Sequence, residues 1–221
     1  MEIENDEGAP WDVRGEEGSR DPCGARALTD LGMIYAGEGR NEAAEAAYGR
    51  ALEECKRLGD MHQAATVMIN FGKLALSMDE PLRAHALAST AATFARRLDH
   101  GPICADALLL MGSIARSAGR WREAERHLDR TLEMSRDGKI PLAEAEAWRE
   151  IGEMRAERGR DREAIEAFRQ ARRCYLVLEA EGEAGRLEDR IREHRTRFRE
   201  TESVVTDEGE TRRDGRSPPG R

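Results

Sequence analysis

Residues 145–171 read AEAWREIGEMRAERGRDREAIEAFRQA, and this stretch decides the fold. Apolar and small side chains recur in it every three or four residues, which is the spacing of one face of an α-helix. The pattern is interrupted at Gly159 and then resumes, so the stretch predicts two helices joined by a short turn. Because Gly152 in the first helix and Ala164 in the second are small, we expect the two helices to pack closely.

The same pattern occurs four times at a constant spacing of 40 residues. In each copy a glycine follows an apolar residue, and an alanine comes twelve residues after the glycine. The glycines are Gly32, Gly72, Gly112 and Gly152, and the alanines are Ala44, Ala84, Ala124 and Ala164. Such a period is typical of an array in which each helical hairpin buries its apolar face against its neighbours.

These residues resemble the tetratricopeptide repeat. The resemblance covers about residues 25–180 and is closest in the fourth copy, with Trp148, Gly152, Ala164, Phe168 and Ala171. The period is longer than the ~34 residues typical of that family, and it is similar to the 40-residue variety of bacterial regulators and cell-polarity scaffolds. The resemblance implies an all-α fold, a right-handed α-solenoid of four helix-turn-helix repeats. The first helix of each repeat would line its concave groove.

The spacing also predicts the organisation of the chain. We expect first helices at 23–37, 61–77, 102–118 and 141–158, and second helices at 42–57, 81–97, 121–135 and 161–179. The solenoid then covers 21–183, with repeats at about 21–60, 61–100, 101–140 and 141–180, and a capping helix follows at 184–200. Residues 1–20 and 201–221 are polar and lack an apolar period, so we expect a disordered acidic leader and a disordered tail.

Two local signals mark helix ends. Asp60 and Gln63 have the spacing of a capping box, which predicts that a helix begins directly after Asp60. One position between the paired helices of each repeat suits the left-handed backbone that ends a helix. It is occupied by Gly39, Asp79, Gly119 and Gly159.

Composition excludes several classes of function. Charged residues make up 36% of the chain and the net charge is −8, so we do not expect the basic surface that nonspecific nucleic-acid binding needs. No apolar run approaches the length that spans a membrane, and Met1–Gly8 is acidic, unlike a secretory signal. We therefore expect a cytoplasmic protein that binds neither nucleic acid nor membrane.

Residue types that carry chemistry are scattered along the chain. The four cysteines contain no Cys-x-x-Cys pair, which favours small buried side chains, and the five histidines show no metal-ligand spacing. No phosphate-binding glycine loop and no Gly-x-Ser-x-Gly motif occurs. The sequence therefore predicts no metal, no cofactor and no enzymatic activity. The residues concerned are Cys23, Cys55, Cys104 and Cys174, and His62, His85, His100, His127 and His194.

The concave groove is the candidate binding site that the resemblance implies. Its N-terminal part is apolar with some positive charge, whereas Glu146, Glu150, Glu153 and Glu157 make its C-terminal part acidic. The alternative is that these positions are ordinary exposed helix faces. The implied lining residues are Thr29, Met33, Ile69, Asn70, Lys73, Leu109, Ser113, Arg116, Arg149, Glu150 and Glu153.

Some members of the family grip acidic C-terminal peptides with lysine, arginine and asparagine side chains on successive first helices. The matching positions here are Thr29, Met33, Asn70, Asp106 and Leu110. Only Asn70 fits that pattern, and Asp106 would repel a carboxylate. The resemblance therefore does not extend to this specificity.

The expected last helix carries a largely apolar stripe of Leu187, Ile191, His194 and Phe198. One interpretation is a cap that covers the end of the array. The other is a short coiled-coil seam through 184–200, which would make the chain a weak dimer instead of a monomer.

Two functions fit this sequence. The first is a non-catalytic interaction module or scaffold that binds a peptide or protein segment in the concave groove. The second is a regulatory or sensor module of a bacterial signalling or transcription-control system, which responds to a peptide or a small effector. An enzyme is disfavoured, because the sequence shows no combination of nucleophile, base and orienting group.

Overall fold

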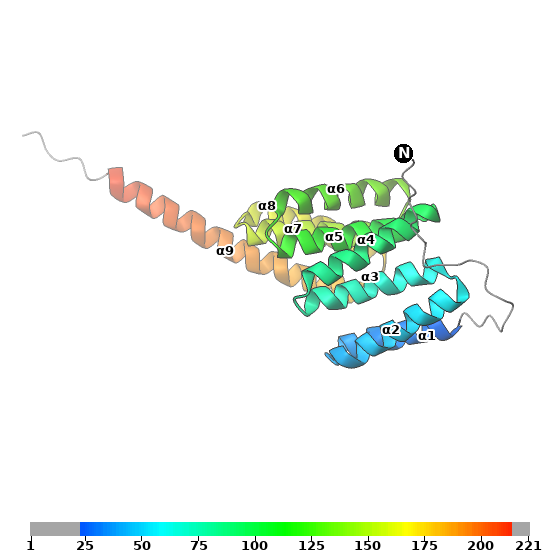
Figure 1. Ribbon diagram of the computed structural model, residues 1–221. Helices are drawn as coiled ribbons and strands as arrows, with labels where there is room; N and C mark the ends of the chain where they lie inside the picture. Colours follow the sequence, from blue (N-terminus) through cyan, green and yellow to red (C-terminus); the bar gives the residue numbers. More distant parts are fainter. Residues whose placement is uncertain (1–22, 214–221) are drawn as a thin grey trace, which may run out of the picture. The chain divides into compact units, whose positions relative to one another are not determined.

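The structure is a computed structural model that describes residues 23–213, with side chains described for residues 24–198. Within that range the chain forms nine α-helices and no strand (Figure 1). The predicted leader at 1–20 lies outside the described residues. The helices are α1 (Cys23–Gly37), α2 (Asn41–Leu58), α3 (Met61–Ser77), α4 (Pro81–Arg97), α5 (Gly101–Ser117), α6 (Trp121–Asp137), α7 (Pro141–Glu157), α8 (Asp161–Val177) and α9 (Glu181–Arg213).

The helices α2 to α9 begin at regular intervals of 20 residues, from Asn41 to Glu181. Two residues before each of these starts, the backbone turns left-handed. The four predicted positions are confirmed, with φ between 61° and 73° at Gly39, Asp79, Gly119 and Gly159. The joins between repeats adopt the same backbone at Gly59, Asp99, Lys139 and Glu179.

Each turn is closed by backbone hydrogen bonds that use the last carbonyls of the preceding helix. Arg40 N–H donates to the Tyr35 carbonyl at 2.9 Å, and Ile140 N–H donates to the Ser135 carbonyl at 2.8 Å. This six-residue closure is the Schellman arrangement, and it satisfies groups that a helix end would otherwise leave unpaired. At the start of α3 the Asp60 carboxylate accepts from Gln63 N–H at 2.9 Å, so the predicted cap is confirmed.

The chain divides into two compact units at Gly119 and Arg120. Unit 1 contains α1 to α5 and unit 2 contains α6 to α9, and each is described by itself. The division lies between the two helices of the predicted repeat at 101–140, so the repeat boundaries stay predictions.

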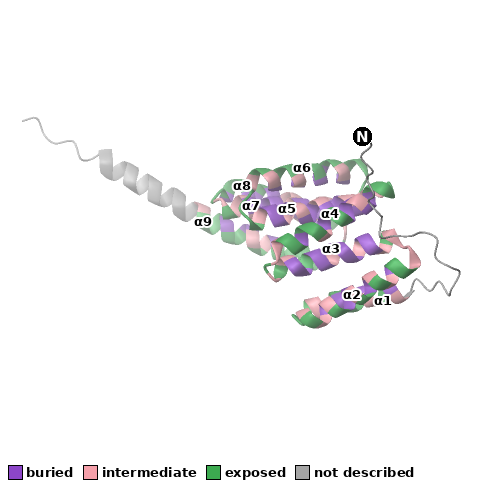
Figure 2. Ribbon diagram, in the orientation of Figure 1, coloured by how far each residue is buried: buried purple, intermediate pink, exposed green. Residues whose placement is uncertain are grey.

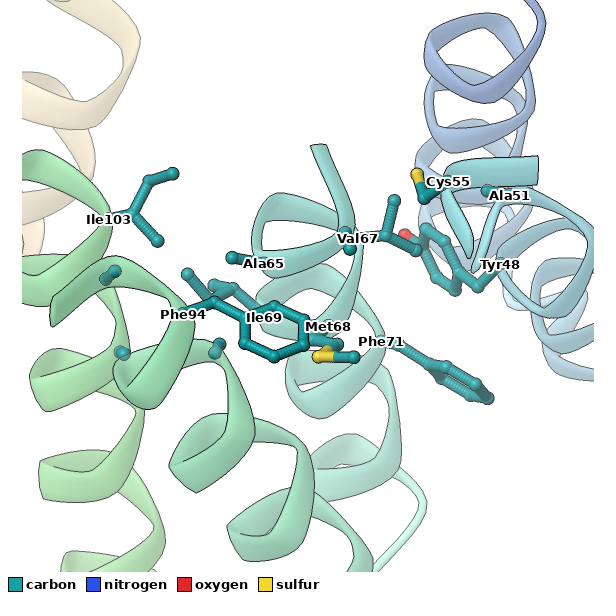
Figure 3. Close-up of a cluster of buried hydrophobic side chains, with 14 of the residues drawn as sticks. Tyr48, Ala51, Cys55, Ala65, Val67, Met68, Ile69, Phe71, Phe94 and Ile103 are labelled. Atoms are coloured by element: carbon teal, nitrogen blue, oxygen red, sulfur yellow. The ribbon is translucent and has the colours of Figure 1, made fainter. Parts of the chain in front are cut away.

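In unit 1 the repeated glycine allows a large side chain to reach the first helix of its hairpin. A Cβ atom on Gly32 would lie 2.6 Å from the Tyr48 ring, and Tyr48 itself is buried beside Phe71 with ring centroids 5.5 Å apart. Figure 3 shows Tyr48 and Cys55 of α2 next to Val67 of α3. The glycine is therefore needed for close approach of α1 and α2.

Burial extends along α3, which Figure 2 shows as largely buried. Cys55 is fully buried, as expected for a packing cysteine, and burial raises the pKa of its thiol to about 12. Cys104 and Cys174 are partly buried, and Cys23 has no described side chain. All three described cysteines are free thiols.

Unit 2 repeats the hairpin and adds α9. A Cβ atom on Gly152 would lie 2.4 Å from the Phe168 ring, so the same close approach occurs between α7 and α8. Leu187 and Ile191 of α9 are buried in a cluster with α8 residues. These two residues of the apolar stripe therefore pack within unit 2, which supports the interpretation of α9 as a cap. They are not exposed for a coiled-coil contact with a second chain.

The predicted limits of the last helix need correction. It was expected at 184–200, whereas α9 spans Glu181–Arg213, so residues 201–213 are helical and not part of a disordered tail. Low hydropathy suggested disorder, but a helix satisfies its own backbone hydrogen bonds and the next proline is Pro218. The rest of the expected tail, 214–221, lies outside the described residues.

Candidate functional site

Three of the implied groove residues in unit 1 are buried and do not present their side chains to solvent. Thr29, Ile69 and Leu109 are 3%, 4% and 3% exposed. The Thr29 hydroxyl donates to the Ala25 carbonyl at 2.7 Å and accepts from the Gln63 amide at 3.1 Å. These residues were expected to line a groove, but Thr29 instead joins α1 to α3 through Gln63, and Ile69 belongs to the unit 1 core.

A second group lies at the surface of the same helices. Met33 of α1 is 51% exposed, and the Asn70 amide nitrogen of α3 lies 3.6 Å from its sulfur. Lys73 is exposed one turn after Asn70 and forms no ion pair with any residue whose side chain is described. Sulfur is a weak acceptor, so this contact ties up little of the hydrogen-bonding capacity of Asn70.

Two further implied groove residues of unit 1 lie on α5, which packs against α3. Ser113 is half-buried, and its hydroxyl donates to the Leu109 carbonyl of its own helix at 3.2 Å. Arg116 is also half-buried and interacts within the chain. We call Met33, Asn70, Lys73, Ser113 and Arg116 the unit 1 inner face.

In unit 2 the implied groove residues on α7 are engaged by neighbouring side chains. Glu150 is buried, and its carboxylate lies 2.9 Å from the Arg149 guanidinium. Burial opposes the charge on Arg149, but Glu150 and the Tyr175 hydroxyl outweigh it and raise the pKa of Arg149 above its ordinary value. Buried carboxylates are retained where such a partner compensates them.

Glu153 is covered by α9. Its carboxylate accepts two hydrogen bonds from the Arg190 guanidinium, at 2.5 Å from Nη2 and 3.3 Å from Nε. Arg190 also pairs with Glu193 at 3.0 Å, and its guanidinium lies 5.8 Å from the centroid of the Phe168 ring. The hydrogen bond that Arg190 donates to Glu153 raises the pKa of Arg190. The expected acidic surface is therefore closed at Glu150 and Glu153.

A buried polar pair further anchors α9. His194 is 1% exposed, and its Nδ1 lies 2.5 Å from the carboxylate of Asp161, the first residue of α8. An ionised carboxylate only accepts, so a hydrogen bond to it requires the proton on Nδ1 of His194. The sequence stripe included His194 but gave no sign of Asp161, which lies 33 residues earlier.

Two histidines that lie 38 residues apart in the sequence, His62 and His100, are in contact. The Nε2 atoms of His62 and His100 lie 3.1 Å apart, and Nδ1 of His100 accepts from Ile103 N–H at 3.2 Å. In a neutral ring that acceptor role leaves the proton on Nε2 of His100, where a metal would have to bind. Within the described side chains no three metal-ligating residues gather. His100 therefore caps α5, and His62 contacts it from α3.

None of the helices described in residues 23–213 is both long enough and apolar enough to cross a membrane.

The paired antiparallel helices of both units place the chain among the α-solenoids, the class of protein predicted from its sequence. Two family models, both described as tetratricopeptide repeat, match residues 25–57 and 103–176. Residues 25–57 and 103–176 therefore carry tetratricopeptide repeats, as the sequence resemblance implied, and the predicted all-α fold is confirmed. No curated protein sequence matches the chain.

Solved structures with the same fold share little sequence with the chain. A Rap conjugation gene regulator of plasmid pLS20 with the Phr* peptide has a TM-score of 0.61 at 14% identity, covering 79% of this chain and 54% of its own. The apo form of RapI has a TM-score of 0.57 at 13% identity, with coverage of 84% and 72%. BtubC from P. vanneervenii has a TM-score of 0.57 at 13% identity, with coverage of 90% and 85%. The chain thus spans about half the length of the first structure, and these identities show the fold alone.

Proposed function

We propose that this chain is a non-catalytic interaction module that binds a peptide or protein segment on the unit 1 inner face. The observation that carries the proposal is the exposure of Met33 beside Asn70 and Lys73, on neighbouring first helices. A half-exposed methionine offers a deformable apolar contact, and an amide next to it offers both a donor and an acceptor. Together they suit an extended segment with its own backbone polar groups.

The charge on this surface suggests the chemistry of the segment. Lys73 presents an exposed ammonium group one turn from Asn70. A segment with an apolar side chain against Met33 and a carboxylate near Lys73 would satisfy both. The corresponding acidic surface of unit 2 is a poorer candidate, because Arg149 and Arg190 already neutralise Glu150 and Glu153.

A similar structure offers independent support for a peptide as the ligand. One Rap regulator of this fold is in complex with the Phr* peptide. Such repeats generally act as non-catalytic scaffolds, which agrees with the scattered chemistry of this sequence.

The second candidate is a regulatory or sensor module in which binding changes the conformation of the chain. It is favoured by the division of the chain at Gly119 and by the fold shared with Rap regulators. A change in the small-angle scattering profile on adding a bound segment would support this version. An unchanged profile with segment bound would favour the plain interaction module.

The test is affinity capture from native lysate with the full chain and with the double variant Lys73→Glu/Arg116→Glu. The matched control is Arg50→Glu/Lys56→Glu, which makes the same charge changes at exposed positions of α2. We expect a protein retained by the wild type and by the control to be lost from the Lys73→Glu/Arg116→Glu variant. Equal retention by all three would contradict binding at the unit 1 inner face.

A further inference from the structure

Unit 2 contains an open groove of about 920 Å³, and none of the implied groove residues lines it. Its α8 side carries Arg162, Ile165 and Arg169, which are spaced three and four residues apart and so share one helix face. Its α9 side carries Arg195 and Phe198. Ile165 is 7% exposed and Phe198 is half-buried, so the groove has an apolar floor between charged edges.

The repeat identifies what occupies the equivalent place in unit 1. A shift of three 40-residue repeats relates Ile165 to Glu45 of α2, and Arg195 to Ala75 of α3. In unit 1 these positions are covered by α4, since Glu45 pairs with Arg83 and Ala75 packs with Ala84 and Ala88. The groove in unit 2 therefore has the form of a seat for a helix that would follow α9 in a further repeat.

The surface of α9 differs from that of α3 in charge. Arg192 and Arg195 stand where α3 has Gly72 and Ala75. A Cβ atom on Gly72 would lie 3.4 Å from the Ala84 carbonyl oxygen, so the helix seated on α3 comes close. Arginines at the same places would hold an incoming helix further away and would favour carboxylates on it.

The glutamates that line this groove form ion pairs with arginines, whereas two of its arginines form none with the described side chains. Glu163 lies 3.7 Å from Arg160, and Glu166 lies 3.4 Å from Arg169. Arg162 and Arg195 form no ion pair with any residue among 24–198. Both residues line the groove, Arg162 from α8 and Arg195 from α9.

We infer that this groove binds an amphipathic α-helix of another protein, with apolar side chains on one face and glutamate or aspartate along its flanks. The apolar face would cover Ile165 and Phe198, and the carboxylates would pair with Arg162 and Arg195. This surface is separate from the unit 1 inner face, so its test is independent of the proposed function.

The experiment uses two fluorescent helix-forming peptides of 17 residues, the length of α4. Both carry an apolar stripe at the positions of Ala84, Ala88 and Ala91, and their flanks carry glutamates in one peptide and lysines in the other. Fluorescence anisotropy with the full chain should show binding of the glutamate peptide and none of the lysine peptide. Added salt should weaken the binding, because the pairs lie at the edge of the groove.

The variant Arg162→Glu/Arg195→Glu should bind the glutamate peptide with an affinity lower by about tenfold or more. The control Arg130→Glu/Arg186→Glu makes the same charge change at exposed positions of α6 and α9, outside the groove, and should bind as the wild type does. Circular dichroism of each variant checks that the helices are retained. Equal binding of the two peptides, binding of neither, or no loss in the groove variant would overturn the inference. A dimer in sedimentation that the groove variant abolishes would also overturn it, since the occupant would then be a second copy of the chain.

Discussion

Met33 and Asn70 in unit 1 occupy the same repeat positions as Glu153 and Arg190 in unit 2. Met33 of α1 contacts Asn70 of α3, and Glu153 of α7 contacts Arg190 of α9. The two residues of each pair are 37 residues apart. In unit 1 the contact is an amide nitrogen 3.6 Å from a thioether sulfur, and Met33 remains half-exposed. In unit 2 it is a two-point bond between charged groups, and the Glu153 side chain is 23% exposed.

The comparison separates what the repeat determines from what the side chains determine. The repeat sets which positions face each other across neighbouring helices, because helix length and turns recur with little change. The side chains then leave the face open to a ligand or close it with an internal ion pair. Unit 2 closes its face because α9 supplies Arg190 opposite Glu153.

The largest expected effect comes from releasing α9 at its buried anchor. Asp161→Ala removes the only described hydrogen-bond partner of His194 and leaves a buried imidazole unpaired. We expect a loss of about 3 kcal/mol in the free energy of unfolding of unit 2. Urea unfolding followed by tryptophan fluorescence measures it, because Trp121 and Trp148 both lie in unit 2.

Asp189→Ala is the matched control for that experiment. Asp189 pairs with Arg192 at 2.9 Å, but its side chain is 72% exposed. An exposed pair of this kind contributes little, so the change should stay below about 0.5 kcal/mol. Similar losses for the two variants would show that Asp161 does not anchor α9.

A smaller effect should distinguish the two equivalent pairs themselves. Arg190→Ala removes two charged hydrogen bonds to Glu153, one to Glu193 and the contact with Phe168, and we expect it to cost about 1 kcal/mol. Asn70→Ala removes a weak contact to sulfur and should cost less than about 0.5 kcal/mol. Thermal unfolding of both variants measures the difference. If Asn70→Ala lowered the free energy of unfolding as much as Arg190→Ala does, the two pairs would not differ as an open and a closed face should.

Most of the helix limits could be predicted from the sequence, because glycine, proline and apolar spacing act locally. The predicted start at 61 and end at 97 coincide with α3 and α4. Lys139 and Glu179 show where local reasoning stops, since neither residue favours the left-handed backbone that each adopts. The regular helix length imposes that turn on them, and only the repeat as a whole carries this information.

The candidate site was predicted less well, because a position on a helix does not reveal what lies opposite. Thr29 was expected in the groove, but Gln63 of α3 draws it into a contact between helices. The pairing of Glu153 with Arg190 depends on the register of two helices far apart in sequence. The cytoplasmic location, the choice between a monomer and a weak dimer, and the absence of nucleic-acid binding stay predictions.

The most direct measurement exchanges the two equivalent pairs and follows binding to the segment that wild type captures. Met33→Glu/Asn70→Arg would close the unit 1 inner face as unit 2 is closed, and Glu153→Met/Arg190→Asn would open unit 2 in the same way. We predict that the first variant stays folded by circular dichroism and loses the segment, whereas the second variant retains it. Retention of the segment by the folded first variant would contradict the claim that this chain binds through the unit 1 inner face.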